Sequence, residues 1–395
     1  HGNHLGLGAS ALYICPLTAL IDQQAKRFSG LFDPQAVPIV PWHADSRTQK
    51  GKKGFLEKPA GVVIITPESL EAQLMRHNTD EQNDICRLYR NIRCIVIDEF
   101  HAFFDNQRGY QLISQLARLD ALTGRAIPRI ALSATFNERI FQDVKSQLRP
   151  DKVSRVEVIL DDHTQRRITY SIKCFIDQIS DDGKTRISRH DQIRDSLYDD
   201  FSTLSPKEKG LIFTNSRQNA EHFSSELHKL SSEPDDKRVF LPHHGSLSAE
   251  KKRAAVEAIL QEERPTSLVC TTTLELGLDI GSITQVGQID PPSTVSSMQQ
   301  RLGCSGRKYD AVSKLIIYVR EAKSRDSRQI LTKLHFPTLQ TLAQIVLVEQ
   351  KEFEPPDRSR AHLSTLIQQI LSYAKQQGSI SIKDARNLFL DNGPF

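Results

Sequence analysis

Residues 95–101 read Ile-Val-Ile-Asp-Glu-Phe-His, a short apolar run that ends in two adjacent carboxylates and a histidine. A run this short and apolar is typical of a buried strand in a parallel sheet. In an open α/β sheet, ligands bind beyond the carboxyl ends of the strands, which is where Asp98 and Glu99 would stand. Carboxylate oxygens at that edge suit a hydrated Mg²⁺ ion beside a nucleotide phosphate. The stretch therefore predicts an α/β sheet that carries a nucleotide site.

Similar apolar runs recur along the chain and alternate with longer amphipathic segments. Short strands separated by helices predict parallel sheets covered on both faces. The runs form two series, which predicts two doubly wound α/β domains, and 395 residues are enough for both. The polar segment 150–187 separates the series, so we expect the first domain at 1–165 and the second at 166–335. The predicted strands are residues 12–15, 61–66, 94–97, 129–132, 210–213, 266–270, 285–289 and 314–318.

The pattern changes after about residue 335. A helical stretch at 339–348 is followed by two prolines, and an amphipathic helix at 362–377 ends at Gly378. A short Ser-Ile-Ser-Ile piece then precedes another helix start, an order typical of the first half of a winged helix. We therefore expect a partial winged-helix domain over 336–395, with a helical cap on the second domain as the alternative.

Composition and charge limit the classes of protein. Apolar residues make up 38% and charged residues 25% of the chain, as in a soluble globular protein. The net charge is only +4, so any nucleic-acid surface must be local. No run of about 18 apolar residues indicates a membrane span, and six cysteines without a Cys-x-x-Cys pair favour a reducing cytoplasm. Because the chain begins with histidine, we expect it to be a fragment of a longer protein.

A phosphoryl-transfer site needs a phosphate cradle, a metal carboxylate, a group that positions water and an arginine. Asp98 would hold Mg²⁺, and Glu99 would orient or deprotonate the attacking water. His101 would report the metal site to the neighbouring domain. Ser133 and Thr135 follow the next apolar strand, where hydroxyls can bond a carboxylate or histidine on the adjacent strand end. A plain helix cap is the alternative interpretation of those hydroxyls.

The second series contains a threonine-rich turn and an arginine-bearing turn. Residues 271–279 read Thr-Thr-Thr-Leu-Glu-Leu-Gly-Leu-Asp and follow a strand. Residues 300–307 read Gln-Arg-Leu-Gly-Cys-Ser-Gly-Arg, with Arg301 and Arg307 close to glycines. Guanidinium groups on such a turn can reach a γ-phosphate with two hydrogen bonds across a domain cleft. Each turn alone could be a plain surface turn, but the ordered set favours a nucleotide site.

Taken together, these segments resemble the superfamily 2 helicases, and most closely the Lhr-like (large helicase-related) group of DEAD/DEAH-box proteins. The resemblance covers roughly residues 11–310, and residues 362–371 resemble the opening of the family's winged-helix domain. The matching segments are 13–24, 66–71, 97–101, 108–109 with 118–119, 132–135, 211–217, 243–248, 271–281 and 300–307.

This resemblance implies two RecA-like domains, with ATP in the cleft between them and single-stranded nucleic acid running across both. It implies ATP and Mg²⁺ as cofactors and 3′-to-5′ movement on single-stranded or 3′-tailed DNA, with RNA as an alternative partner. The residues implied to face the nucleotide, besides Asp98 and Glu99, are Gly277, Asp279, Arg301 and Arg307. The residues implied to line the nucleic acid, mostly through backbone amides and hydroxyls, are Pro16, Leu17, Thr66, Pro67, Glu68, Ser69, Thr214, Asn215, Ser216, His244, Gly245 and Thr271.

The sequence departs from the family pattern at three places. It has no Gly-x-x-x-x-Gly-Lys-Ser/Thr loop, since Gly183-Lys184-Thr185 lacks the first glycine. We expect that loop upstream of His1, and weak ATP binding by the chain as it stands. Cys304 stands where the family motif carries an arginine, and Phe100 stands where it carries a small or aliphatic residue.

Two other functions stay open. The chain could be a degenerate relative that binds nucleic acid without efficient ATP turnover, because of Cys304 and the absent loop. It could instead be a motor of the same superfamily that moves another polymer, such as polypeptide, or that serves a restriction complex. We favour an ATP-dependent helicase or translocase, because so many segments match in the family's order.

Overall fold

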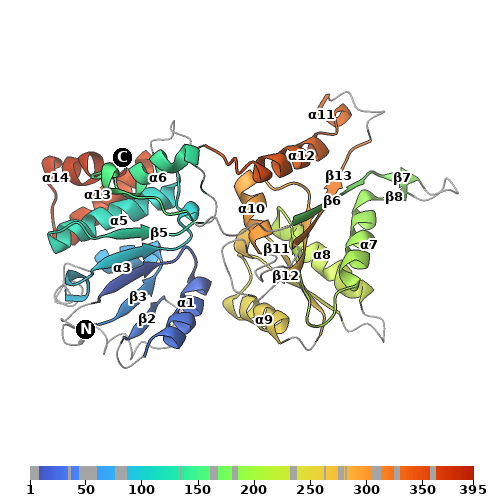
Figure 1. Ribbon diagram of the computed structural model, residues 1–395, viewed down its shortest axis with the longest axis horizontal. Helices are drawn as coiled ribbons and strands as arrows, with labels where there is room; N and C mark the ends of the chain where they lie inside the picture. Colours follow the sequence, from blue (N-terminus) through green and yellow to red (C-terminus); the bar gives the residue numbers. More distant parts are fainter. Residues whose placement is uncertain are drawn as a thin grey trace. The chain divides into compact units, whose positions relative to one another are not determined.

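The computed structural model describes two compact units, and each is considered by itself (Figure 1). Unit 1 comprises His1–Ile159 with Pro355–Phe395, and unit 2 comprises Leu160–Glu354. None of the helices that the structure describes is long and apolar enough to span a membrane. The described residues are 9–33, 37–43, 60–75, 87–133, 136, 138–160, 168–179, 186–231, 238–261, 264–274, 280, 283–304, 313–323, 330–355 and 362–395.

The sheet of unit 1 is parallel, with its strands in the order β2-β3-β1-β4-β5. Ile14 at the end of β1 is in register with Ile65 on β3 and with Ile97 on β4, so these three strands end at the same level. The residues that follow them, including Thr66 and Asp98, therefore emerge along one edge of the sheet. The strands are β1 (Ala11–Ile14), β2 (Ile39–Trp42), β3 (Val62–Ile65), β4 (Cys94–Ile97) and β5 (Arg129–Ala131).

Helix α5 (Gln107–Thr123) shows why the helices of unit 1 begin and end where they do. The Asn106 side chain accepts a hydrogen bond from Gly109 N at 3.0 Å, which caps the first turn, and Gly124 ends the helix with a φ of 65°. Position 109 needs glycine, because a Cβ there would lie 1.6 Å from Phe103 O. The other helical segments are α1 (Thr18–Leu31), η1 (Phe100–Ala102), α3 (Pro67–Leu74), η2 (Glu138–Ile140), α6 (Phe141–Leu148), η3 (Val153–Arg155), α13 (Leu363–Gln377), α14 (Ile382–Arg386) and the π-helix η6 (Asn387–Asp391).

The main sheet of unit 2 is also parallel, with the order β10-β11-β9-β12-β13-β6. Edge strand β6 lies in the polar segment 150–187, where the sequence pattern predicts no strand, and it pairs with β13 along its whole length. A short antiparallel hairpin, β7 and β8, stands apart from this sheet. The strands are β6 (Ile168–Phe175), β7 (Gln178–Ile179), β8 (Arg186–Ile187), β9 (Lys209–Phe213), β10 (Val239–His243), β11 (Thr266–Cys270), β12 (Ile283–Ile289) and β13 (Ser313–Arg320).

Helix α7 packs closely on the sheet of unit 2 because two glycines make room for it. A Cβ on Gly210 of β9 would lie 2.6 Å from the Phe201 ring, and one on Gly287 of β12 would lie 3.1 Å from it. The ring is thereby buried in the core between α7, α8 and the strands. The helices are α7 (Arg189–Ser202), α8 (Arg217–Leu230), α9 (Ala249–Leu260), η4 (Thr272–Leu274), α10 (Val295–Gly303), α11 (Ile330–Lys333) and α12 (Phe336–Glu349).

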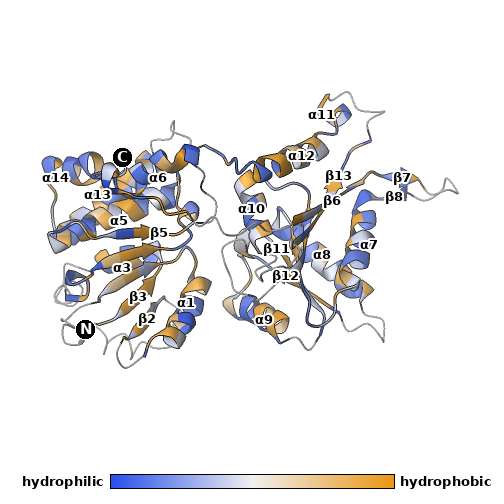
Figure 2. Cartoon of the chain, viewed as in Figure 1, coloured by the Kyte–Doolittle hydropathy of each residue, from blue (hydrophilic) through white to orange (hydrophobic). Residues whose placement is uncertain are grey.

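The C-terminal helices fall into different units. α12 packs against α10 and β13 of unit 2, whereas α13 packs against α5 of unit 1. The segment 336–395, predicted as one domain, therefore has helices in both units, and its boundaries, like 1–165 and 166–335, stay predictions. Figure 2 shows hydrophobic strands within each unit and helices of mixed character around them. Both main sheets are parallel and carry helices, as predicted.

Candidate functional site

Asp98 stands at the carboxyl end of β4 and is held by two hydrogen bonds. Gln24 of α1 donates from Nε2 to Asp98 Oδ2 at 3.2 Å, and the backbone N–H of Glu99 donates to Oδ1 at 3.1 Å. Burial, and then the nearby Asp98 carboxylate, raise the pKa of the Tyr13 phenol, so this neighbour on β1 stays neutral. A carboxylate has about four lone-pair sites, so both oxygens can still accept from a metal-bound water.

Glu99 takes a left-handed backbone conformation that residues other than glycine rarely adopt. Its φ is 48° and its ψ is 51°, at the point where β4 turns into η1. Such conformations cost about 1–3 kcal/mol and cluster at functional sites, where the surroundings hold them. The turn brings Glu99 Oε2 to 3.4 Å from His101 Nδ1. The residue predicted to position water thus stands on a strained turn.

His101 connects this turn to the next strand end. Its Nδ1 lies 3.2 Å from Ser133 Oγ, just beyond β5. Burial lowers the pKa of His101 to about 4, so the ring is neutral at pH 7. Its Nε2 is buried without a hydrogen-bond partner among the residues that the structure describes. The structure brings Glu99, His101 and Ser133 together, and Thr135 lies outside the described residues.

Arg108 joins two of the segments predicted to line the nucleic acid. Its Nη2 donates to Pro16 O at 2.9 Å, and its Nε donates to Glu68 Oε1 at 2.8 Å. Its guanidinium also lies 5.3 Å from the centre of the Phe103 ring. Burial alone would raise the pKa of Glu68, but the hydrogen bond from Arg108 lowers it, so the carboxylate stays charged. Arg108 was part of a matching segment, but the sequence did not reveal this bridging role.

The predicted nucleic-acid residues of unit 1 differ in exposure. Thr66 is buried and caps α3 by accepting from Ser69 N at 3.4 Å. Pro16 and Pro67 are buried as well, whereas Leu17 and Ser69 are half-buried and Glu68 is exposed.

A second edge of the same kind is formed in unit 2. Phe213, His243 and Cys270 are in register at the ends of β9, β10 and β11. Thr214 N donates to Cys270 O at 2.8 Å and Thr271 N donates to His243 O at 3.3 Å, so the ladder continues one residue beyond the strands. The predicted residues Thr214, His244 and Thr271 therefore emerge side by side.

Exposure divides this second set too. Asn215, Ser216 and Gly245 are exposed, whereas Thr214 and His244 are buried. His244 Nε2 lies 3.0 Å from Glu221 Oε1 of α8. The Ser216 side chain caps α8 by accepting from Asn219 N at 3.1 Å. The exposed Ser216 and Gly245 therefore lie next to the buried Thr214 and His244 in the chain.

Arg301 is almost completely buried, with 2% of its surface exposed. Its Nη1 donates to Gln288 Oε1, and the same nitrogen lies 3.4 Å from Asn215 Oδ1. Its guanidinium lies 5.1 Å from the centre of the Phe213 ring. The side chain is therefore turned into unit 2, and the other residues predicted to face the nucleotide in this half, Gly277, Asp279 and Arg307, lie outside the described residues.

Cys304 is a buried thiol at the end of α10. Its Sγ donates to Leu274 O at 3.3 Å, which connects α10 to η4. Cys304 is therefore a packing residue in this structure, in the position where the family motif carries an arginine.

A buried ion pair lies beneath the predicted nucleic-acid segment of α3, and sequence reasoning missed it. Arg118 of α5 is fully buried, and its Nη1 donates to Glu71 Oε1 at 2.7 Å. Gln115 donates to Glu71 Oε2 at 2.6 Å and to Pro67 O at 3.0 Å. Burial alone would raise the pKa of Glu71, but Arg118 and the hydrogen bonds lower it. The pair is thus charged and connected to the first turn of α3.

Helix α13 completes the shell around this pair. Gln376 Oε1 accepts from Arg118 Nε at 2.9 Å and from Nη2 at 2.6 Å. Gln369 donates to Glu71 Oε2 at 2.8 Å, and the Ser372 hydroxyl also donates to Glu71. The available signal was the spacing of Gln369, Ser372 and Gln376, which puts three polar side chains on one face of a helix.

Family comparisons agree with this geometry in both halves of the chain. Residues 3–144 match the DEAD/DEAH box helicase family, and residues 191–309 match the helicase conserved C-terminal domain.

Individual relatives and solved structures point to the same group. An ATP-dependent helicase Lhr-Core protein 2 of Thermococcus barophilus is 32% identical over 78% of this chain and 35% of the relative. An ATP-dependent helicase Lhr-Core of Methanothermobacter thermautotrophicus is 30% identical over 76% of this chain and 33% of the relative. The chain thus spans about a third of the length of these relatives.

The structure of Mycobacterium smegmatis helicase Lhr bound to ssDNA and AMP-PNP superposes with a TM-score of 0.74 at 20% identity, covering 98% of this chain and 48% of that one. This likeness confirms the predicted fold of two tandem RecA-like domains. With both halves of the chain matched in order, the chain belongs to the superfamily 2 helicases, and within them to the Lhr-like group.

Proposed function

We propose that the protein is an ATP-dependent helicase or translocase that moves 3′ to 5′ on DNA and hydrolyses ATP between its two RecA-like domains. The observation that carries the proposal is the grouping of Asp98, Glu99, His101 and Ser133 at one edge of the first sheet. The relatives named ATP-dependent helicase support the proposal, and the chain spans about a third of their length. The cysteines that the structure describes are free, and free cysteines are typical of proteins in a reducing compartment. We therefore propose a cytoplasmic location.

The residues at the end of β4 fit a hydrated Mg²⁺ ion. The ion prefers oxygen ligands and keeps several of its waters, and Asp98 offers carboxylate oxygens fixed by Gln24 and by the backbone of Glu99. When bound, Mg²⁺ would neutralise charge on the ATP phosphates. Glu99 would accept a proton from the attacking water, and the neutral His101 would link its position to Ser133.

Nucleic acid would be held at the strand ends of both units. Exposed groups such as Ser216 and Gly245 offer hydroxyl and backbone contacts to phosphates and sugars, which are largely independent of sequence. In unit 2 the buried Thr214 would keep Ser216 in place, and in unit 1 Arg108 and the Thr66 cap would hold the segments at Pro16 and Ser69. The ssDNA in the structure of the M. smegmatis protein supports a single-stranded partner.

The test is the DNA-stimulated ATPase of the natural full-length protein. Glu99→Gln keeps the side-chain shape but removes the base, so we expect turnover to fall by about 10²–10⁴-fold, with binding to a 3′-tailed oligonucleotide retained. Glu138→Gln, an exposed position on η2, is the matched control and should turn over ATP at the wild-type rate. Absence of DNA-stimulated hydrolysis in the wild type, or an unaffected Glu99→Gln variant, would overturn the proposal.

A further inference from the structure

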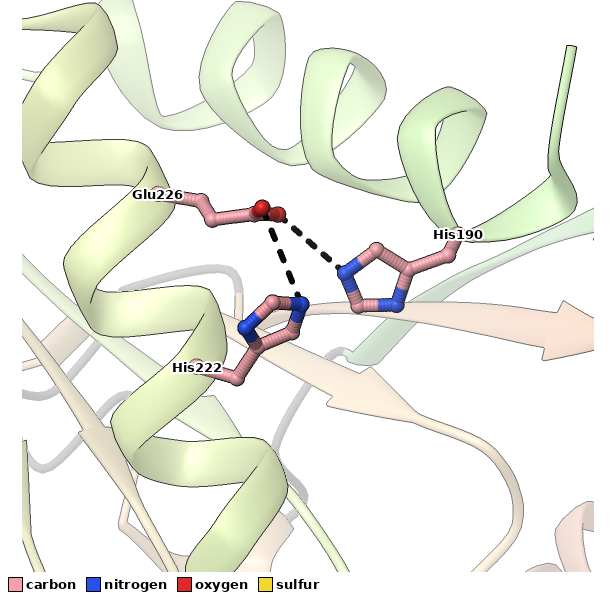
Figure 3. Close-up of side chains that lie close together, drawn as sticks. All are labelled: His190, His222 and Glu226. Atoms are coloured by element: carbon pink, nitrogen blue, oxygen red, sulfur yellow. Dashed lines mark hydrogen bonds and ion pairs between the residues drawn. The ribbon is translucent and has the colours of Figure 1, made fainter.

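Two histidines and a glutamate, none of them among the residues predicted to bind nucleotide or nucleic acid, meet between α7 and α8 of unit 2. His190 belongs to the first turn of α7, and His222 and Glu226 stand one helical turn apart on α8. Figure 3 shows both imidazole rings directed toward the carboxylate between them. His190 Nε2 lies 3.2 Å from Glu226 Oε2, and His222 Nε2 lies 3.7 Å from Glu226 Oε1.

The spacing of these donors is close to that of a metal site. The ligand atoms of all three residues lie within 4.8 Å of one another. Tetrahedral ligands at about 2.1 Å from a zinc ion lie about 3.4 Å apart. Each imidazole is therefore already near the required distance from one of the two Glu226 oxygens, and the three-donor set has to contract from within 4.8 Å to bind an ion.

The surroundings hold the donors without using up the carboxylate. The His190 ring packs 4.3 Å from the centre of the Phe223 ring, which limits its rotation. Arg194, a nearby cation on α7, forms ion pairs with Asp191 and Asp195 and also interacts electrostatically with Glu226. The side chain of His222 is 52% exposed, which leaves a path for an ion to enter, whereas His190 and Glu226 are 26% and 23% exposed.

We propose that His190, His222 and Glu226 bind a zinc-like divalent transition-metal ion. Two imidazole nitrogens and one carboxylate oxygen suit Zn²⁺, Co²⁺ or Ni²⁺, whereas Mg²⁺ and Ca²⁺ prefer sets made of oxygen alone. Three protein ligands leave a position for water or for a side chain of another molecule. The ion would join the first turn of α7 to α8, and this inference does not depend on the proposed helicase activity.

Zn²⁺ titration of the full chain tests the site. We expect calorimetry to detect a binding event that weakens at least about tenfold in His190→Ala, His222→Ala and Glu226→Gln. His228→Ala, on the same helix α8 but outside the cluster, is the matched control and should bind as the wild type does. Zn²⁺ at a hundred times its dissociation constant should raise the melting temperature on the order of 5 °C in the wild type and the control only.

Two further measurements separate binding from misfolding. Circular dichroism without metal should be the same for all variants, and Co²⁺ should give the visible absorption of a tetrahedral complex in the wild type but not in His222→Ala. If the wild type and His222→Ala bind Zn²⁺ equally tightly, or if neither binds it, the cluster is only an ion pair and the inference is wrong.

Discussion

Among the described residues, each unit buries one arginine of a matching segment, but with different partners. Arg118 in unit 1 is fully enclosed with a carboxylate, Glu71, and with amide and hydroxyl groups from α13. Arg301 in unit 2 has among its partners the amide oxygens of Gln288 and Asn215 and the ring of Phe213. A buried guanidinium needs charge or dipole compensation in either case. The comparison teaches that both arginines position their surroundings, the first beneath α3 and the second between α10 and β12.

The largest effect concerns catalysis. The Arg301 side chain is turned into unit 2, so of the two arginines that the family resemblance implies at the nucleotide we propose that Arg307 stabilises the charge at the γ-phosphate. We expect Arg307→Ala to lower ATP turnover by about 10³-fold or more. Single-turnover ATPase measurements on the natural full-length protein check this, with Arg301→Lys as the comparison. Should Arg301→Lys lose as much turnover as Arg307→Ala at unchanged stability, the positioning role of Arg301 is refuted.

The next effect is on the stability of unit 1. Arg118→Leu leaves the Glu71 carboxylate buried without its cation, so we expect the free energy of unfolding to fall by about 3–5 kcal/mol. Trp42, the single tryptophan of the chain, lies on β2 and reports unit 1 in urea titrations. The double variant Arg118→Leu with Glu71→Leu should recover much of the loss, because neither charge is then left alone. A double variant as unstable as the sum of the single variants would contradict this account.

The pH dependence extends the comparison to histidines. Burial lowers the pKa of His101 in unit 1 and of His243 in unit 2 to about 4. The unfolded chain takes up these protons near pH 6.5 but the folded chain does so only near pH 4, so stability falls as the pH drops through that window, by up to about 3 kcal/mol per histidine. Trp42 fluorescence during urea unfolding at pH 7 and pH 4.5 measures this for unit 1. His101→Gln should flatten that dependence, and His243→Gln should leave it unchanged.

The smallest effect is expected for Arg301→Leu. The amide oxygens of Gln288 and Asn215 would lose a donor, which costs about 1–3 kcal/mol, less than an unpaired carboxylate. Hydrogen exchange of the backbone amides in β9 and β12 should speed up, while Trp42 fluorescence of unit 1 is unaffected. A loss equal to that of Arg118→Leu would remove the distinction between the two arginines.

The fold was predictable wherever a strand is short, apolar and central. The edge strands β2, β6 and β10 were missed. β2 and β10 contain a proline, Pro41 and Pro242, and β6 alternates residues such as Thr169 and Lys173 with apolar ones in a polar segment. The pattern of apolar residues reveals strands that are buried on both faces of a sheet. An edge strand pairs with only one neighbouring strand and can keep polar residues, so this pattern is weaker there.

The site was predictable where register alone decides it. Asp98 and Ser133 follow adjacent parallel strands, so their proximity follows from the sheet. The contact of Arg118 with Gln376 joins residues 258 positions apart, and its polar character hides it from a search for apolar stripes. The proximity of His190 and His222 in the proposed metal site depends on the packing of α7 on α8, which no local sequence pattern predicts.

The way α13 completes unit 1 has a consequence for biosynthesis. Arg118 and Glu71 leave the ribosome long before Gln369, Ser372 and Gln376, and all of unit 2 is translated in between. At about 5–20 residues per second, that interval lasts on the order of 10–50 seconds. During it the nascent unit 1 has the ion pair of Arg118 and Glu71 without the hydrogen bonds from α13. Unit 1 therefore reaches its final packing only after α13 has been translated.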